Sequence, residues 1–180
     1  MTTGYMAAGR NIRAGLDAGA SVQADARQII RAGIAGGLVG GVVIWIYEAA
    51  IWVGVQHLMP LAGIPRNATG LVFGQQVQDS LGPVAYVVGT LIHFCFAIAW
   101  GVLFALIWPS FRRRNIEATL VALFYAVVAW IVMHAAIMVV SSNHPNYYDP
   151  NVVIGGFLSH FFFTVPLALV VKRRLGRPGA

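Results

Sequence analysis

Four long apolar runs dominate the 180-residue sequence and restrict its fold more than any other feature. Crossing the hydrocarbon core of a bilayer, roughly 30 Å thick, takes about 20 helical residues. Each run is that long, and with 58% hydrophobic and 10% charged residues a soluble domain of this size would lack polar surface. The sequence therefore predicts an all-α polytopic membrane protein, an antiparallel bundle of four transmembrane helices at 32–59, 84–108, 116–140 and 152–171.

Basic residues predict the orientation of the four spans, because short basic loops are disfavoured on the translocated side. Of the 12 Lys and Arg residues, only Arg66 falls in a predicted outer loop. We therefore expect both termini in the cytoplasm, with a cytoplasmic segment at 1–31, a transmembrane domain at 32–171 and a basic tail at 172–180. The basic residues lie in clusters beside the spans, which favours contact with lipid headgroups and no nucleic-acid partner.

Small residues spaced four apart predict where the helices pack, since they let two backbones approach closely in lipid. The ridges include Gly33, Gly37 and Gly41 in the first span, Gly89 and Gly101 in the second, and Gly156 in the fourth. They predict contacts within one protomer or between protomers, so a homo-oligomer held by glycine-rich faces stays open.

Each predicted span contains one buried ionisable residue: Glu48, His93, His134 and His160. Such residues are costly in a membrane and are functional candidates by default. At the rise of an α-helix all four lie about 9–16 Å below the outer surface, at comparable depth. We expect them to converge on one site in the outer half of the bundle, with His57 and His144 near the outer mouth as a path to the exterior.

Two interpretations of this set involve a bound group. Three imidazoles and one carboxylate are a complete set of ligands for a divalent transition metal, and helical bundles build metal sites from facing helices. Alternatively, two of the histidines are axial ligands of a b-type haem, with Gly89 and Gly156 leaving room for the macrocycle.

Two further interpretations need no bound group. In one, the cluster senses or relays protons, because histidine changes charge in the mildly acidic range and a buried carboxyl group can do the same. In the other, each histidine hydrogen-bonds a neighbouring backbone carbonyl or Glu48, so the cluster only stabilises the bundle through interhelical hydrogen bonds. The sequence has no phosphate loop, no G-x-S-x-G and no H-E-x-x-H motif, so it gives no support to an enzyme.

Four short segments contain the candidate residues: WIYE at 45–48, HFCFA at 93–97, VMH at 132–134 and GFLSH at 156–160. This combination resembles the YagU-like inner-membrane proteins of bacteria over roughly residues 32–171. In that family a W-x-x-E motif and one histidine in each later span recur, at the positions of Glu48, His93, His134 and His160. The resemblance implies a location in the bacterial plasma (inner) membrane and a link to acid tolerance, although the first outer loop is shorter here and the N-terminal segment differs.

Overall fold

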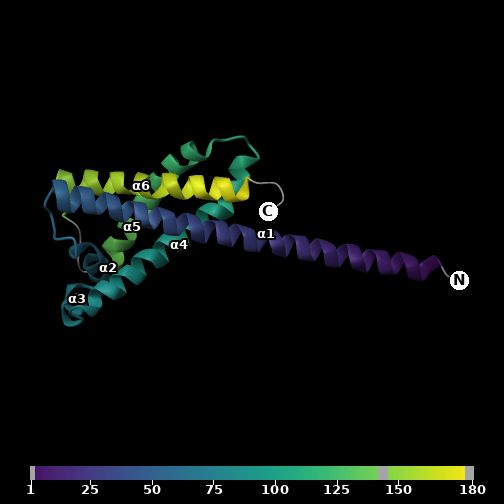
Figure 1. The fold of residues 1–180 in the computed structure, drawn as a ribbon, viewed down its shortest axis with the longest axis horizontal. Helices are drawn as coiled ribbons and strands as arrows, with labels where there is room; N and C mark the ends of the chain where they lie inside the picture. The colour runs from purple at the N-terminus through teal and green to yellow at the C-terminus, as the bar shows by residue number, and fades with distance from the viewer. Residues whose placement is uncertain (1–2, 142–145, 177–180) are drawn as a thin grey trace.

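A computed structural model describes the backbone of residues 3–141 and 146–176, and the side chains in these ranges from residue 26 onward except that of Val140. The described chain is helical and contains no β-strand (Figure 1). Its elements are α1 (Thr3–Glu48), the π-helix η1 (Ala49–Val55), α2 (Gly63–Phe73), α3 (Gln75–Ser80), α4 (Val84–Arg112), α5 (Ala118–Val140) and α6 (Pro150–Leu175).

Four segments of the described chain are long and apolar enough to cross a membrane, which confirms the prediction of a multi-pass membrane protein. They are Ala26–Val55, Val84–Arg112, Ala118–Val139 and Pro150–Leu175. Their ends differ from the predicted ones by a few residues, as helix ends commonly do. The N-terminal part of the chain is helical from Thr3, and α1 continues through the predicted boundary at residue 31 into the first span.

Helices α1 and α4 touch through backbone at the glycine ridges. A Cβ added at Gly37 would lie 2.7 Å from the Cα of Ile98, and one at Gly101 would lie 2.8 Å from the Cα of Gly37. A Cβ at Gly33 would similarly overlap the backbone of Val102. Only glycine permits this approach, which in lipid provides the packing that holds helices together.

A second glycine ridge on α1, formed by Gly36 and Gly40, faces α6. A Cβ at Gly36 would be 3.0 Å from the carbonyl oxygen of Leu167, and one at Gly40 would be 2.8 Å from the ring of Phe163. Later positions on α1 thus meet earlier positions on α6, and the same reversed order holds between α1 and α4. Both glycine ridges of α1 are therefore in contact with helices of the same protomer.

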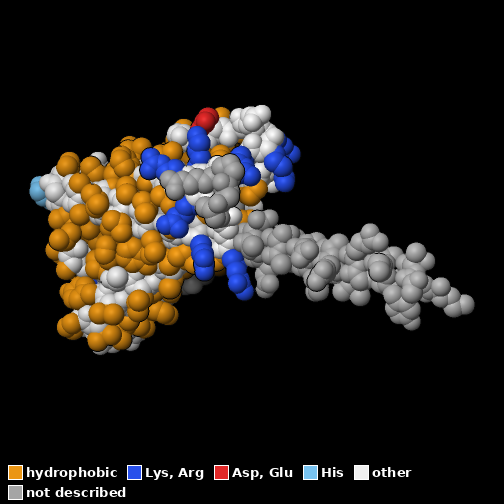
Figure 2. Space-filling model, turned by 45° about the vertical axis from the view of Figure 1, so that its right-hand side comes forward, with side chains coloured by type: hydrophobic (Ala, Val, Ile, Leu, Met, Phe, Trp, Pro, Cys, Tyr) orange, Lys and Arg blue, Asp and Glu red, His pale blue; other side chains and the backbone are white. Residues whose placement is uncertain are grey.

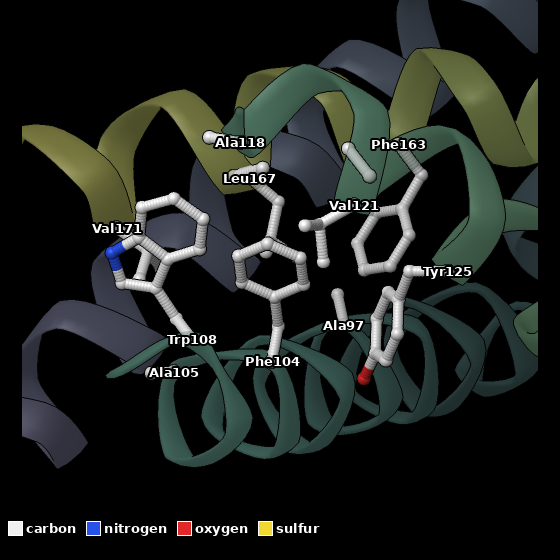
Figure 3. Packing of buried hydrophobic residues seen from close by; sticks show 12 residues of the cluster. Ala97, Phe104, Ala105, Trp108, Ala118, Val121, Tyr125, Phe163, Leu167 and Val171 are labelled. Carbon is white, nitrogen blue, oxygen red and sulfur yellow. The ribbon is translucent and has the colours of Figure 1, made fainter. Parts of the chain in front are cut away.

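An apolar core fills the space between α4, α5 and α6 (Figure 3). Phe104 is fully buried there and packs edge to face on Tyr125, with ring centroids 5.2 Å apart. Leu167 and Val171 reach the same core from α6. The Thr164 hydroxyl donates a 3.0 Å hydrogen bond to the carbonyl of Ala122, which joins α6 to α5.

The segment between the first two predicted spans, 60–83, is largely helical. Helices α2 and α3 together cover most of it, separated by Gly74 at φ 86°. Helix α2 packs on the start of α4: the Thr69 hydroxyl donates to the Ala85 carbonyl at 2.7 Å, and a Cβ at Gly89 would overlap the Pro65 carbonyl. The loop folds because α4 presents small residues to it.

Candidate functional site

Two of the four predicted site residues lie side by side at the end of the bundle away from Arg112. His134 on α5 and His160 on α6 have ring centroids 5.8 Å apart. Helix α6 carries glycine one turn before His160, and the Nε2 atom of His134 lies 4.0 Å from the position that a Cβ of Gly156 would occupy. A methyl group at position 156 would therefore make only ordinary contact with the His134 ring, which lies beside this glycine.

Each of these imidazoles is fixed by its own helix. The Nδ1 atom of His134 is 2.8 Å from the Trp130 carbonyl, and the Nδ1 atom of His160 is 2.7 Å from the Gly156 carbonyl. A carbonyl only accepts, so Nδ1 carries the proton in both neutral rings and Nε2 presents a lone pair. Neither Nε2 atom has a hydrogen-bond partner in the part of the chain that the structure describes.

His93 has a different environment. Its Nε2 atom donates to the Gly41 carbonyl on α1 at 3.0 Å, so this histidine joins two helices. Its ring also stacks on Trp45, with centroids 5.1 Å apart and planes 28° from parallel. The interpretation in which a histidine only joins two helices by a hydrogen bond therefore fits His93. The hydrogen bonds of His134 and His160 each stay within one helix.

A small pocket connects the two environments. Its volume is about 90 Å³, and it is lined by His93 and His160 together with Ile44, Met133 and other apolar side chains. A site of this size can hold a few water molecules where polar groups face it. The pocket therefore gives His160 and His93 a shared space without direct contact.

Glu48 lies one helical turn beyond Ile44 on α1, and residues four apart share a helix face. It is 9% exposed, and its carboxylate forms no ion pair or hydrogen bond with any described residue. Its neighbour Tyr47 donates to the Gly155 carbonyl at 3.2 Å and stacks on Phe162, which fixes this turn of α1 against α6. Glu48 thus shares the face of α1 that leads to the pocket but forms no hydrogen bond with any of the three imidazoles.

The sequence did not reveal that Glu48 ends the regular part of α1. The next seven residues form η1, a π-helix. Such helices are rare, and those that occur are often found at functional sites.

Four buried polar atoms near this end of the bundle have no hydrogen-bond partner in the described chain: Trp52 Nε1, Gln56 Oε1, Trp130 Nε1 and Tyr147 Oη. Trp130 and Tyr147 contact the His134 ring at centroid distances of 4.9 and 5.7 Å. The sequence could not reveal these atoms, because an unpaired polar atom is a property of the packed structure.

The complete set of metal ligands expected from the sequence does not form. Among the described residues, no group of three or more His, Cys, Asp or Glu side chains could hold a metal ion. Divalent transition metals bind proteins through three or four such ligands, and His134 with His160 supplies two. The physical reason is that His93 hydrogen-bonds Gly41 of α1, while Glu48 lies one helical turn beyond Ile44, which lines the pocket.

The space beside His160 is also too small for a haem as the described side chains lie. The pocket beside His160 is about 90 Å³, far below the roughly 300–1,000 Å³ of pockets that enclose drug-sized ligands. Gly89, expected to leave room for the macrocycle, faces Pro65 and Thr69 of α2 instead. A groove of about 460 Å³ between α2 and α4 is lined by apolar residues and contains no histidine.

The two remaining predicted residues are His57 and His144. His57 is exposed and follows η1 in a turn with φ 52°, where it lies outside the packed bundle. His144 lies outside the described residues. The proposed path from the cluster to the exterior through these two side chains therefore stays a prediction.

Together, fold and site define a four-span membrane protein with a histidine pair and a nearby buried carboxyl group at one end. Comparisons of the chain with family models, with curated proteins and with solved structures gave no match.

Proposed function

We propose that this protein responds to protons through His134, His160 and Glu48, as a sensor or relay in the bacterial plasma membrane. The observation that supports this most is the pair of imidazoles 5.8 Å apart, each with Nδ1 bonded to its own helix and Nε2 open. An open Nε2 is a proton acceptor, and histidine changes charge at mildly acidic pH.

Charge explains why such a pair could act as a switch. Two imidazolium groups this close repel each other strongly in a medium of low dielectric constant. The pair therefore favours one added proton over two. Glu48, buried at the end of α1 without an ion-pair partner in the described chain, is a third group that can exchange a proton.

The proposed orientation is N-in/C-in, in an antiparallel bundle. It is supported by the reversed order of contacts along α1 with α4 and α6, and by the basic residues that adjoin one end of every span. In this orientation the histidine pair lies in the outer half and senses the exterior. The resemblance to the YagU-like proteins, with its link to acid tolerance, agrees with this role but stays a proposal.

Tryptophan fluorescence gives a direct test, because the indole of Trp130 lies 4.9 Å from the His134 ring. A cation forming beside an indole interacts with its π face. A variant with Trp130 as the sole tryptophan, reconstituted in nanodiscs, should change its emission between pH 7.5 and 5. His134→Gln, His160→Gln and Glu48→Gln should each abolish or displace this transition, whereas His57→Gln should leave it unchanged.

A second measurement separates sensing from relay. Proteoliposomes with an internal pH dye report proton entry after external acidification: a relay gives protein-dependent entry that Glu48→Gln removes, and a sensor gives the fluorescence transition without entry. If the transition has the same midpoint in wild type and in the His134, His160 and Glu48 variants, while all remain folded, the proposed function is wrong.

A further inference from the structure

The end of the bundle opposite the histidine pair collects arginines from three segments that are distant in sequence. We call this surface the basic end and define it by its arginines: Arg27, Arg31, Arg112, Arg113, Arg114, Arg173 and Arg174, all exposed. Figure 2 shows the blue Lys and Arg side chains gathered on one part of the surface, beside the broad apolar area of the spans.

Direct contacts hold the three segments together. The Arg112 guanidinium donates to the Leu175 carbonyl, and the Gln28 amide donates to the Arg174 carbonyl at 3.4 Å. The ends of α4 and α6 and the beginning of the α1 span therefore meet. Their arginines form one surface, not three separate clusters.

Among the side chains that the structure describes, little negative charge compensates this surface. Glu117, the described carboxylate next to it, is occupied by Lys172, with Nζ 2.9 Å from Oε2. None of the arginines of the basic end takes part in an ion pair with a described residue. Their positive charge is thus available to an external anion.

The residues around these arginines indicate what kind of molecule carries that anion. Exposed apolar side chains adjoin the arginines along the helices: Ile30 lies between Arg27 and Arg31, Leu169 lies one turn before Arg173, and Leu106 and Ile107 precede Arg112. A molecule that satisfies both features has an anionic head and an apolar tail. Guanidinium groups are matched to phosphate oxygens, and basic groups at the ends of spans attract anionic lipid.

We propose that the basic end binds the phosphate headgroups of anionic phospholipids in the adjoining leaflet. The proposal rests on neither the histidine pair nor the direction in which the protein is inserted. Nucleic acids and soluble anions share the phosphate chemistry but lack the tail, so the apolar rim favours lipid.

The test uses full-length protein in detergent, titrated with phosphatidylglycerol or cardiolipin and, separately, with phosphatidylcholine. Native mass spectrometry counts bound lipids, and thermal unfolding reports stabilisation. We expect retention of anionic lipid, with a higher midpoint of unfolding, that phosphatidylcholine does not give. The variant Arg113→Gln/Arg114→Gln/Arg173→Gln/Arg174→Gln should bind more weakly, by about fivefold for each arginine removed.

Arg66→Gln is the control for a lost cation, because Arg66 is paired with Asp79 at 2.7 Å and lies outside the basic end. It should retain the wild-type affinity. If the quadruple variant fails to insert, the wild-type comparison between anionic and zwitterionic lipid still decides. Equal binding of both lipids, equal loss in Arg66→Gln, or equal stabilisation by inorganic polyphosphate or an oligonucleotide would each overturn the proposal.

Discussion

His134 and His160 lie on neighbouring helices with ring centroids 5.8 Å apart, yet neither donates a hydrogen bond across the helix interface. His93, on α4, does the opposite: it bonds the Gly41 carbonyl of α1. The three histidines therefore divide into a pair with open Nε2 atoms and a single residue that joins two helices. This division predicts different consequences of substitution.

Replacing His93 should reduce stability and leave the pH response of Trp130 intact. His93→Leu removes an interhelical hydrogen bond, which in membrane proteins averages about 0.6 kcal/mol, and a ring stack with Trp45 of about 0.5–1.5 kcal/mol. We expect a loss of roughly 1–2 kcal/mol, measured by reversible unfolding in mixed micelles. His93→Gln, which retains a donor, should recover part of it. An unchanged stability in His93→Leu would argue against the structural role.

A single methyl group at Gly37 should disrupt the contact between α1 and α4. The added Cβ would meet the backbone of Ile98 at 2.7 Å, and backbone cannot move aside as a side chain can. Overpacking of this kind costs about 1–3 kcal/mol. Gly54→Ala is the matched control, because its Cβ would lie 3.6 Å from the Ala49 carbonyl, an ordinary contact. Equal thermal midpoints for the two variants would contradict the packing argument.

The Thr164 hydroxyl should contribute to the joining of α5 and α6. Thr164→Val preserves shape but leaves the Ala122 carbonyl without its 3.0 Å bond. That carbonyl retains its helical bond, so we expect a loss of only about 0.6 kcal/mol, with an upper limit near 1.7 kcal/mol. Thr90→Val provides a comparison, since its hydroxyl bonds only within α4, to Tyr86. A larger loss at Thr90 than at Thr164 would count against the prediction.

Acid should weaken the contact between the start of α5 and the end of α6. The Lys172 ammonium, through its hydrogen bond and its charge, holds the pKa of Glu117 below the usual value of about 4.5. Because the folded pKa is the lower one, the stabilisation is complete above the usual value and is lost as pH falls through the folded one. Since Glu117 is exposed, the effect should be small and weakened by salt. Glu117→Gln should flatten this acid limb of a plot of unfolding midpoint against pH; an unchanged limb would show that the pair does not contribute.

The sequence alone determined the class of fold and the residues that would be exceptional in it. Hydropathy is a property of each residue added along the chain, so the four spans could be located to within a few residues of those in the structure. The unusual residues Glu48, His93, His134 and His160 were visible for the same reason: an ionisable group in an apolar run is conspicuous without any knowledge of its neighbours.

Tertiary structure alone decided how those residues are grouped. Each residue step turns a helix by about 100°, so equal depth in the membrane does not imply a shared direction, and His93 faces α1 while His134 and His160 face each other. The glycine ridges predicted close contact but not its partner: Gly89 packs against α2, and the two ridges of α1 contact α4 and α6. The π-helix after Glu48 and the folding of α2 onto α4 likewise depend on contacts between distant segments. Packing fixes the rotation and axial position of each helix through many small contacts at once, and no local pattern in the sequence contains that sum.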